Sequence, residues 1–423
     1  MKGTGLLLVT LGLIVTFGAA GPSSAVPVTG APEVFFLDPS VRAAGAGRAS
    51  TAVWWGGDPD YWANPALLGY HHGIRLETAR RRLVPDLAHG VYFRTDRWTF
   101  GLWGIGMAAA GKPPDLGGCR LDYGPSMAVD EQGHELGRFD SWETMQYRAI
   151  GLSTAELATH LLWLVDRHGP DLRRYGDISL GRAFKNAEVF LAPGWAIPSG
   201  EDARARTSTR DEGILFRVTP INSLRDSGEP GGHRHGMSRG GVRLDVSFAK
   251  ATQNKKDAYL LYPAEAAADP VPRVRKTGWG MRASLGSSSW VHQTLVGWDL
   301  ACLEPSLQPM LSLGLAVDRS QLSAGFPGQR EVTKGRSITT LGVELSAGRI
   351  LTLRGGRIDD PDGDIIGYTY GVGLGIEIGK AGGFRWDFAD IPQARELDRV
   401  HRNSLSLFFD PLETFSLLRG VDW

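Results

Sequence analysis

Apolar and polar residues alternate over long stretches in the C-terminal half of the chain. The clearest stretch is 368–379, where six apolar residues at every second position oppose glycine, threonine and glutamate. Because successive side chains of a β-strand point to opposite faces, this pattern predicts a strand with one apolar face. Shorter segments repeat the pattern at 242–248, 279–286, 311–318, 341–348, 384–389 and 405–409.

The length of these strands favours a membrane barrel. A strand of about 10 residues crosses a bilayer, whereas strands of soluble proteins usually stop near 5 or 6 residues. The run at 368–379 is therefore expected to face lipid on its apolar side. A soluble β-sandwich or a periplasmic barrel is the alternative, since core-facing side chains alternate there too.

The N-terminal half is less regular. We expect strands at 147–154 and 177–191, and a pair of strands within 92–107 joined around 95–97. The segment 153–165 fits a short helix or a continued strand equally well. Two stretches without an apolar period, 198–240 and 262–277, are expected to form long exposed loops.

The first 25 residues have the layout of a secretory signal peptide. Lys2 precedes an apolar run at 6–20, and small residues follow at 23–25. The run is short for a membrane helix, although a retained N-terminal anchor is the alternative. After it, no stretch of 18 or more apolar residues occurs, so helical membrane spans are not expected.

Composition narrows the class of protein. The 46 basic and 46 acidic residues cancel, so the basic excess of a nucleic-acid binder is absent and no nucleic-acid partner is expected. Glycine supplies 56 of 423 residues, about twice the usual ~7%, without a collagen repeat, so the glycines must lie within the structure. Cys119 and Cys302 are equally compatible with one disulfide and with two thiols.

Two segments resemble a known family. Residues 36–70 contain an Arg-Ala-x-Gly-x-Gly element followed by an acidic turn and an Asn-Pro-Ala motif, and this order resembles the N-terminal signature of PorV/PorQ-type and FadL-like outer-membrane barrels. The closing strands at 354–392 and 401–409 resemble the same proteins through a glycine-rich strand and through Arg385, Asp387, His401, Arg402 and Ser404. The motif residues near the N-terminus are Arg42, Ala43, Gly45, Gly47, Ala49, Asp58, Asn64, Pro65 and Ala66.

The resemblance implies an all-β fold, a single antiparallel transmembrane β-barrel of about 14 strands in the outer membrane. Residues 26–72 would form an N-terminal hatch or plug, 73–410 the barrel and 411–423 a tail. The first strand is expected near Gly73, and either Phe409 or Trp423 ends the barrel. The hatch motif residues are expected to pack the plug rather than to contact a ligand.

The resemblance also suggests the function. The leading hypothesis is a PorV/PorQ-like binding or assembly role in type IX-like protein export, with outer-membrane lipid around the barrel and secreted proteins or secretion-system components as partners. The alternative is FadL-like uptake of a hydrophobic small molecule, with Trp54, Trp55, Tyr61 and Trp62 as candidate ligand-adjacent aromatics.

Signs of enzyme chemistry are weak. No nucleophile elbow, zinc helix, phosphate loop or dinucleotide fingerprint occurs, so we expect no cofactor, no metal and no catalytic residue, and an outer-membrane enzyme is the least favoured hypothesis. The acidic run at 359–364 suggests a calcium loop but lacks the closing glutamate, which favours a turn. Inward-facing charges are expected to pair within the barrel: Arg243, Asp245, Arg282, Asp318, Glu344, Glu377, Arg385 and Asp387.

Overall fold

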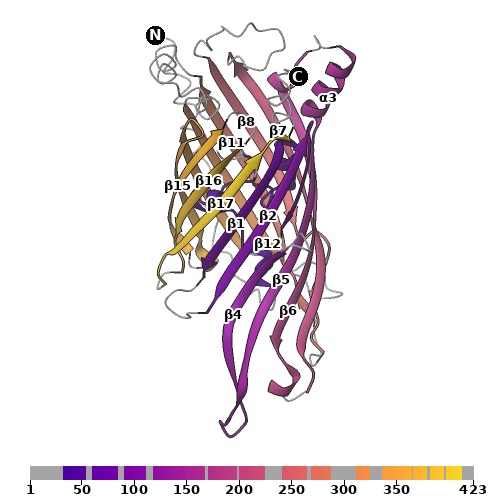
Figure 1. The fold of residues 1–423 in the computed structure, drawn as a ribbon, viewed down its shortest axis with the longest axis vertical. Coiled ribbons are helices and arrows are strands. Elements are labelled where there is room, and N and C mark those ends of the chain that lie inside the picture. The colour runs from indigo at the N-terminus through magenta and orange to yellow at the C-terminus, as the bar shows by residue number, and fades with distance from the viewer. Residues whose placement is uncertain are drawn as a thin grey trace.

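The fold is a closed antiparallel β-barrel (Figure 1). The computed structural model describes residues 32–53, 60–83, 90–110, 118–166, 170–197, 200–223, 241–263, 268–286, 311–323, 336–363, 365–378, 382–394 and 397–411. The first strand, β1, pairs with β2 on one side and with the last strand, β17, on the other. This pairing closes the sheet into a barrel.

The strands follow one another around the barrel in chain order. A two-stranded ribbon, β9 (Tyr259–Leu260) with β10 (Asp269–Pro270), lies in the connection after β8. The wall consists of β1 (Gly73–Arg82), β2 (Tyr92–Leu102), β3 (Ile105–Ala110), β4 (Gly118–Val129), β5 (Glu135–Ser153), β6 (Gly176–Ala192), β7 (Ala203–Asn222), β8 (Val242–Gln253), β11 (Arg273–Leu285), β12 (Leu311–Ser323), β13 (Ser337–Ala347), β14 (Leu351–Asp360), β15 (Ile365–Ile378), β16 (Gly382–Ile391) and β17 (Val400–Phe409).

The wall has fourteen strand positions among the described residues. The sheet contains 15 strands, but β3 and β4 share one position, because both lie between β2 and β5. The expected number of about 14 is confirmed. The last strand, β17, ends at Phe409 and closes against β1, whereas Trp423 lies outside the described residues.

The outer face of the barrel is apolar. On β15, Tyr368, Tyr370, Leu374 and Ile376 are between 37% and 59% exposed, while the alternate Thr369 is buried. Exposed apolar side chains continue around the wall, including Leu76, Phe184, Trp279, Leu313 and Leu405. A closed barrel with an apolar outer band and polar residues turned inward is an outer-membrane barrel, so the soluble alternatives are wrong.

The expectation of a long loop at 198–240 is wrong in its first part. Residues 203–222 form β7, a strand of 20 residues, while 224–240 lie outside the described residues. Near its start, β7 turns Arg204 and Arg206 outward, where both are exposed. β4 to β7 extend beyond their neighbours at one end of the barrel (Figure 1). The inward residues in this part of β7 are small, such as Ala205 against Val189, so the strand has no apolar period to detect.

Two further boundaries differ from expectation. No turn interrupts β2 at 95–97, because the chain reverses at Trp103 and Gly104, both with positive φ. The expected loop at 262–277 ends earlier, since β11 begins at Arg273. The segment that fitted either a helix or a strand is the helix α3 (Thr154–Val165), while the expected strand at 177–191 is confirmed as β6.

The segment before β1 lies inside the barrel. It contains the 3-10 helix η1 (Glu33–Phe35), the short helix α2 (Val41–Gly45) and the 3-10 helix η3 (Pro65–Tyr70). We call the described residues 32–53 and 60–72 the hatch. The described part of the chain contains no helix long and apolar enough to cross a membrane.

Candidate functional site

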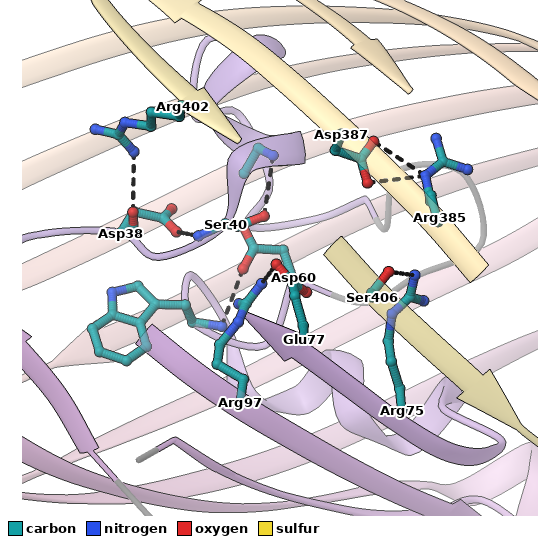
Figure 2. Close-up of polar contacts among 12 residues, drawn as sticks. Asp38, Ser40, Asp60, Arg75, Glu77, Arg97, Arg385, Asp387, Arg402 and Ser406 are labelled. Atoms are coloured by element: carbon teal, nitrogen blue, oxygen red, sulfur yellow. Dashed lines mark hydrogen bonds and ion pairs between the residues drawn. The ribbon is translucent and has the colours of Figure 1, made fainter. Parts of the chain in front are cut away.

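The candidate site is the interface between the hatch and the inner wall of the barrel. Its first element is α2, which starts at Ser40 because the Ser40 hydroxyl accepts a hydrogen bond from the Ala43 amide at 3.1 Å. The Asp38 carboxylate in turn accepts from the Ser40 amide at 2.8 Å. Figure 2 shows this turn against Arg402 of β17, whose guanidinium donates to the Asp38 carbonyl oxygen at 3.1 Å.

Gly45 and Gly47 hold the hatch backbone against the wall. A Cβ atom on Gly45 would lie 3.0 Å from the Cα atom of Gly371. Gly47 has a φ of +67°, a conformation that favours glycine, and a side chain there would meet the Leu341 carbonyl. The Thr369 hydroxyl accepts from the Gly47 amide and donates to the Gly45 carbonyl, both at 2.9 Å. The two motif glycines therefore allow a backbone approach that one wall hydroxyl fixes.

A row of wall glycines accommodates η3. Five inward positions on adjacent strands are paired with one another across the sheet, and none carries a side chain. We call them the glycine row: Gly101, Gly106, Gly151, Gly181 and Gly213. The row gives five of the glycines a structural role, since it forms a flat track on the inner wall.

The hatch backbone lies directly on this track. A Cβ atom would overlap the Pro65 carbonyl carbon at Gly181 and the Leu68 carbonyl oxygen at Gly106. Asn64 fixes the start of η3, because its side-chain oxygen accepts from the Ala66 amide at 3.0 Å and its side-chain nitrogen donates to the Thr51 carbonyl at 2.9 Å. The Asn-Pro-Ala motif is thus the N-terminal cap of the element that occupies the glycine row.

Wall side chains bind the hatch backbone on several sides. Ser247 of β8 donates to the Ala52 carbonyl at 2.7 Å, and Asp318 of β12 accepts from the Thr51 amide at 2.7 Å. Glu143 of β5 accepts from the Val34 amide at 2.9 Å. Further bonds run from Ser179 to Ala66, from Tyr147 to Tyr61 and from Gln253 to Trp62. The hatch is therefore fastened around the circumference of the barrel.

An aromatic cluster fills the space between hatch and wall. Trp62 of the hatch stacks on Tyr147 of β5, with ring centroids 4.8 Å apart. Lys185 of β6 lies 4.9 Å from the Trp62 ring and forms an ion pair with Asp211 at 2.7 Å, both side chains being fully buried. We call Phe35, Tyr61, Trp62, Phe93 and Tyr147 the aromatic cluster; all are buried members of one apolar core.

A small polar cavity lies beside this cluster. Its volume is about 30 Å³, which suits one or two water molecules. A drug-sized ligand needs roughly 300 to 1,000 Å³. Its walls include Ser40, Arg42, Asp60, His71, Arg75, Glu77 and Arg97.

Two hatch residues at the cavity have displaced pKa values. Burial raises the pKa of Asp60 to about 7, and the neighbouring Asp38 adds to the rise while Arg97 opposes it. The Asp60 carboxylate accepts from the Ser50 hydroxyl at 2.9 Å and from the Trp62 amide at 3.3 Å, so it joins the two arms of the hatch.

Burial also lowers the pKa of His71 to about 3, and His72 adds to this effect. The His71 imidazole forms a hydrogen bond with the Thr99 hydroxyl at 2.6 Å. An imidazole with so low a pKa is a poor general base, so this pair does not favour the enzyme hypothesis.

Five of the eight inward charges pair with other charges of the wall, as expected, whereas Asp318 binds the hatch backbone instead. Arg354 bridges Glu344 and Asp387, at 2.8 Å each, and Asp387 also binds Arg385 at 3.0 Å. Arg243 pairs with Asp245 at 2.9 Å. Among the described residues, no group of three His, Cys, Asp or Glu side chains could hold a metal ion.

Some of the remaining predicted residues belong to the described part of the chain and others do not. Tyr61 and Trp62 are 3% and 2% exposed, so they belong to the packed interior, and Tyr61 also lines the small cavity. Arg42 is buried in α2 at the cavity, and Cys119 is a buried free thiol of β4. Trp54, Trp55, Asp58, Cys302 and the side chain of Glu377 lie outside the described residues.

Comparison with known proteins gives similarity of structure alone. No protein-family model matches the sequence, and no curated protein matches it. The chain is similar to a FadL homologue of Pseudomonas aeruginosa, with 10% identity over 88% of this chain and 98% of that chain and a TM-score of 0.37. It is also similar to the toluene transporter TbuX of Ralstonia pickettii, with 10% identity, coverage of 88% and 97% and a TM-score of 0.38. For the monoaromatic hydrocarbon channel CymD the identity is 9%, the coverage 88% and 97%, and the TM-score 0.38.

Proposed function

We propose that this barrel takes up hydrophobic small molecules across the outer membrane and that the hatch must move for them to pass. The observation that carries the proposal is the aromatic cluster, which places an apolar core inside the lumen, between hatch and wall. The lumen of an ordinary water-filled barrel is polar. Displacing the hatch would open aromatic and aliphatic wall surface to an apolar molecule.

The contacts of the hatch fit an element that moves. Most of the bonds that fasten it join its backbone to single wall side chains, such as the bond that Ser247 donates and the bond that Asp318 accepts. Each is worth about 0.5–1.5 kcal/mol net, or somewhat more where a carboxylate accepts. The similar structures named above include a toluene transporter and a monoaromatic hydrocarbon channel, which suggests toluene as the first probe.

A reversible cross-link tests the proposal. Ala52→Cys with Ser247→Cys, in a background with Cys119→Ala and Cys302→Ser, places one thiol on the hatch and one on the wall, at two residues that the Ser247 hydroxyl now joins through the Ala52 carbonyl. We expect the oxidised form to lose uptake of radiolabelled toluene into cells and the reduced form to regain it. The single variant Ser247→Cys is the control. Equal uptake by the oxidised and reduced forms would show that hatch movement is not required.

A PorV/PorQ-like role in protein export is the second candidate. The observation that favours it is the extension formed by β4 to β7, since β5, β6 and β7 have 19, 17 and 20 residues. About 9–11 residues are enough to cross the membrane. The rest of each strand can present a surface to a macromolecule beyond the bilayer.

Shortening this extension separates the two candidates. Replacing residues 127–136, at the β4–β5 hairpin, by a two-residue turn removes the tip of the extension and leaves the hatch intact. An export role predicts loss of secreted proteins from the cell surface with normal toluene uptake. Normal surface display in the shortened variant would contradict the export role.

A further inference from the structure

The helix α3 has two halves of different character. Its first turn is anchored to the barrel, because the Ser153 hydroxyl accepts from the Glu156 amide at 3.2 Å and Asp177 of β6 accepts from the Ala155 amide at 2.7 Å. Ala155, Glu156 and Thr159 are buried there. Figure 1 shows the helix at the rim of the barrel, at the end opposite the β4–β7 extension.

The second half of α3 is apolar and exposed. Leu161, Leu162, Leu164 and Val165 are 52%, 39%, 68% and 90% exposed. Four exposed large apolar side chains within five residues are unfavourable in water. The arrangement indicates that something other than water covers this half of the helix.

The exposed half is continuous with the lipid-facing band of the wall. Trp103, in the turn between β2 and β3, is 42% exposed and lies edge-on to the ring of His160, 6.1 Å away. Ile105 and Ile178, on the strands next to the helix, are 40% and 44% exposed on the same outer surface. The apolar band thus runs without interruption from the wall onto α3.

The polar partners of the helix suit a membrane surface. His160 stacks on Trp163 at 5.5 Å, and the guanidinium of Arg173 lies over the Trp163 ring at 5.3 Å. Tyr175, one residue before β6, is 71% exposed. Tryptophan, tyrosine and arginine collect at the boundary between acyl chains and headgroups, where their apolar parts meet lipid and their polar ends meet water.

We infer that the distal half of α3 is an interfacial membrane anchor, with Leu161, Leu164 and Val165 in the acyl chains of a phospholipid leaflet. The short amphipathic turn would then fix the rim of the barrel at the bilayer surface. The inference goes beyond the proposed function, since it holds whether or not the barrel transports a small molecule.

Spin labels test the depth of this helix. The purified barrel, with Cys302→Ser, is labelled at Leu164→Cys and reconstituted into phosphatidylethanolamine and phosphatidylglycerol vesicles. Collision rates with oxygen and with a water-soluble nickel chelate are then measured. Leu405→Cys, on the outer face of β17, is the lipid reference, and Glu131→Cys, on the exposed β4–β5 turn, is the water reference.

We expect the label at position 164 to behave like the label at 405, with frequent oxygen collisions and few nickel collisions. Behaviour like that at position 131 would overturn the inference, because it would place the helix in water rather than in lipid. All labelled sites are exposed, so folding of the barrel is checked for each by its heat-dependent gel migration.

Discussion

At the scale of single residues, the position of the hatch depends on glycines of the wall, which have no side chains. The glycine row works because the wall carries no Cβ atoms where η3 lies, and Gly181 contacts the Pro65 and Ala66 backbone. By the same argument, a glycine with open space around its Cβ position can be replaced without displacing the hatch. Gly355, in β14, has open space where a Cβ would be placed.

Gly181→Val is therefore expected to displace η3 without unfolding the barrel. Overpacking of this kind costs about 1–3 kcal/mol. Limited proteolysis of the folded, detergent-solubilised protein should cut the hatch of Gly181→Val faster than that of the wild type. Gly355→Val is the matched control, and equal cleavage of the two variants would contradict the docking of η3 on the glycine row.

Asp60 is expected to make stability depend on pH. Its pKa is about 7 in the folded state against 3.8 as an ordinary carboxyl, so the folded protein binds the proton more tightly than the unfolded chain does. Its contribution to stability is then greatest below about pH 4 and declines as the pH rises to 7, by an amount on the order of 4 kcal/mol.

Asp60→Asn should flatten this part of the pH profile. The measurement is the thermal unfolding midpoint in detergent at pH 5 and pH 8. The wild type should lose more stability between these values than Asp60→Asn, while the exposed Asp257→Asn should behave like the wild type. Identical pH profiles for the wild type and Asp60→Asn would show that Asp60 does not titrate in this range.

At the scale of elements, what the sequence reveals depends on what surrounds each strand. β15 is evident because lipid covers one face and the lumen the other, so Tyr368 and Tyr370 alternate with Thr369 and glycines. At the start of β7, Arg204 and Arg206 face outward and alternate with small residues, of which Ala205 packs with Val189, Leu260 and Tyr262. Hydrophobic periodicity therefore detects the strands with large apolar residues on one face and misses the first part of β7.

The candidate site likewise contains residues that the sequence reveals and residues that it does not reveal. Gly45, Gly47 and the Asn-Pro-Ala motif can be found in the sequence because local turns and close contacts require these residues. Their wall partners Thr369, Ser247 and Asp318 are ordinary inward polar residues, and no local signal separates them from their neighbours. Only the closed barrel brings residues more than 190 positions apart together.

Thr369→Val tests the docking of α2 on β15. Valine preserves the shape of the side chain but removes both the donor and the acceptor that fix the backbone of Gly45 and Gly47. A buried unsatisfied amide costs about 1–3 kcal/mol. Hydrogen exchange of the Gly47 amide should be faster in this variant, and unchanged in the exposed control Thr339→Val. Equally slow exchange in both variants would rule out this contact.

At the scale of the whole molecule, the protein is a closed barrel with an apolar outer face and with the hatch inside it. The wall is continuous because β1 meets β17 over seven paired positions. Among the described residues, the hatch backbone packs on the glycine row and on the aromatic cluster, and a small cavity lies beside Asp60. A barrel built in this way lies in the outer membrane, with its hatch packed against the inner wall.

The most direct test of this account is a semi-native gel of detergent-extracted outer membranes, run with and without boiling. A membrane barrel stays folded in detergent and migrates anomalously until it is heated. The account predicts that the protein is found in the outer-membrane fraction and that its band shifts on boiling. Recovery in the soluble periplasmic fraction with no shift would contradict the transmembrane barrel.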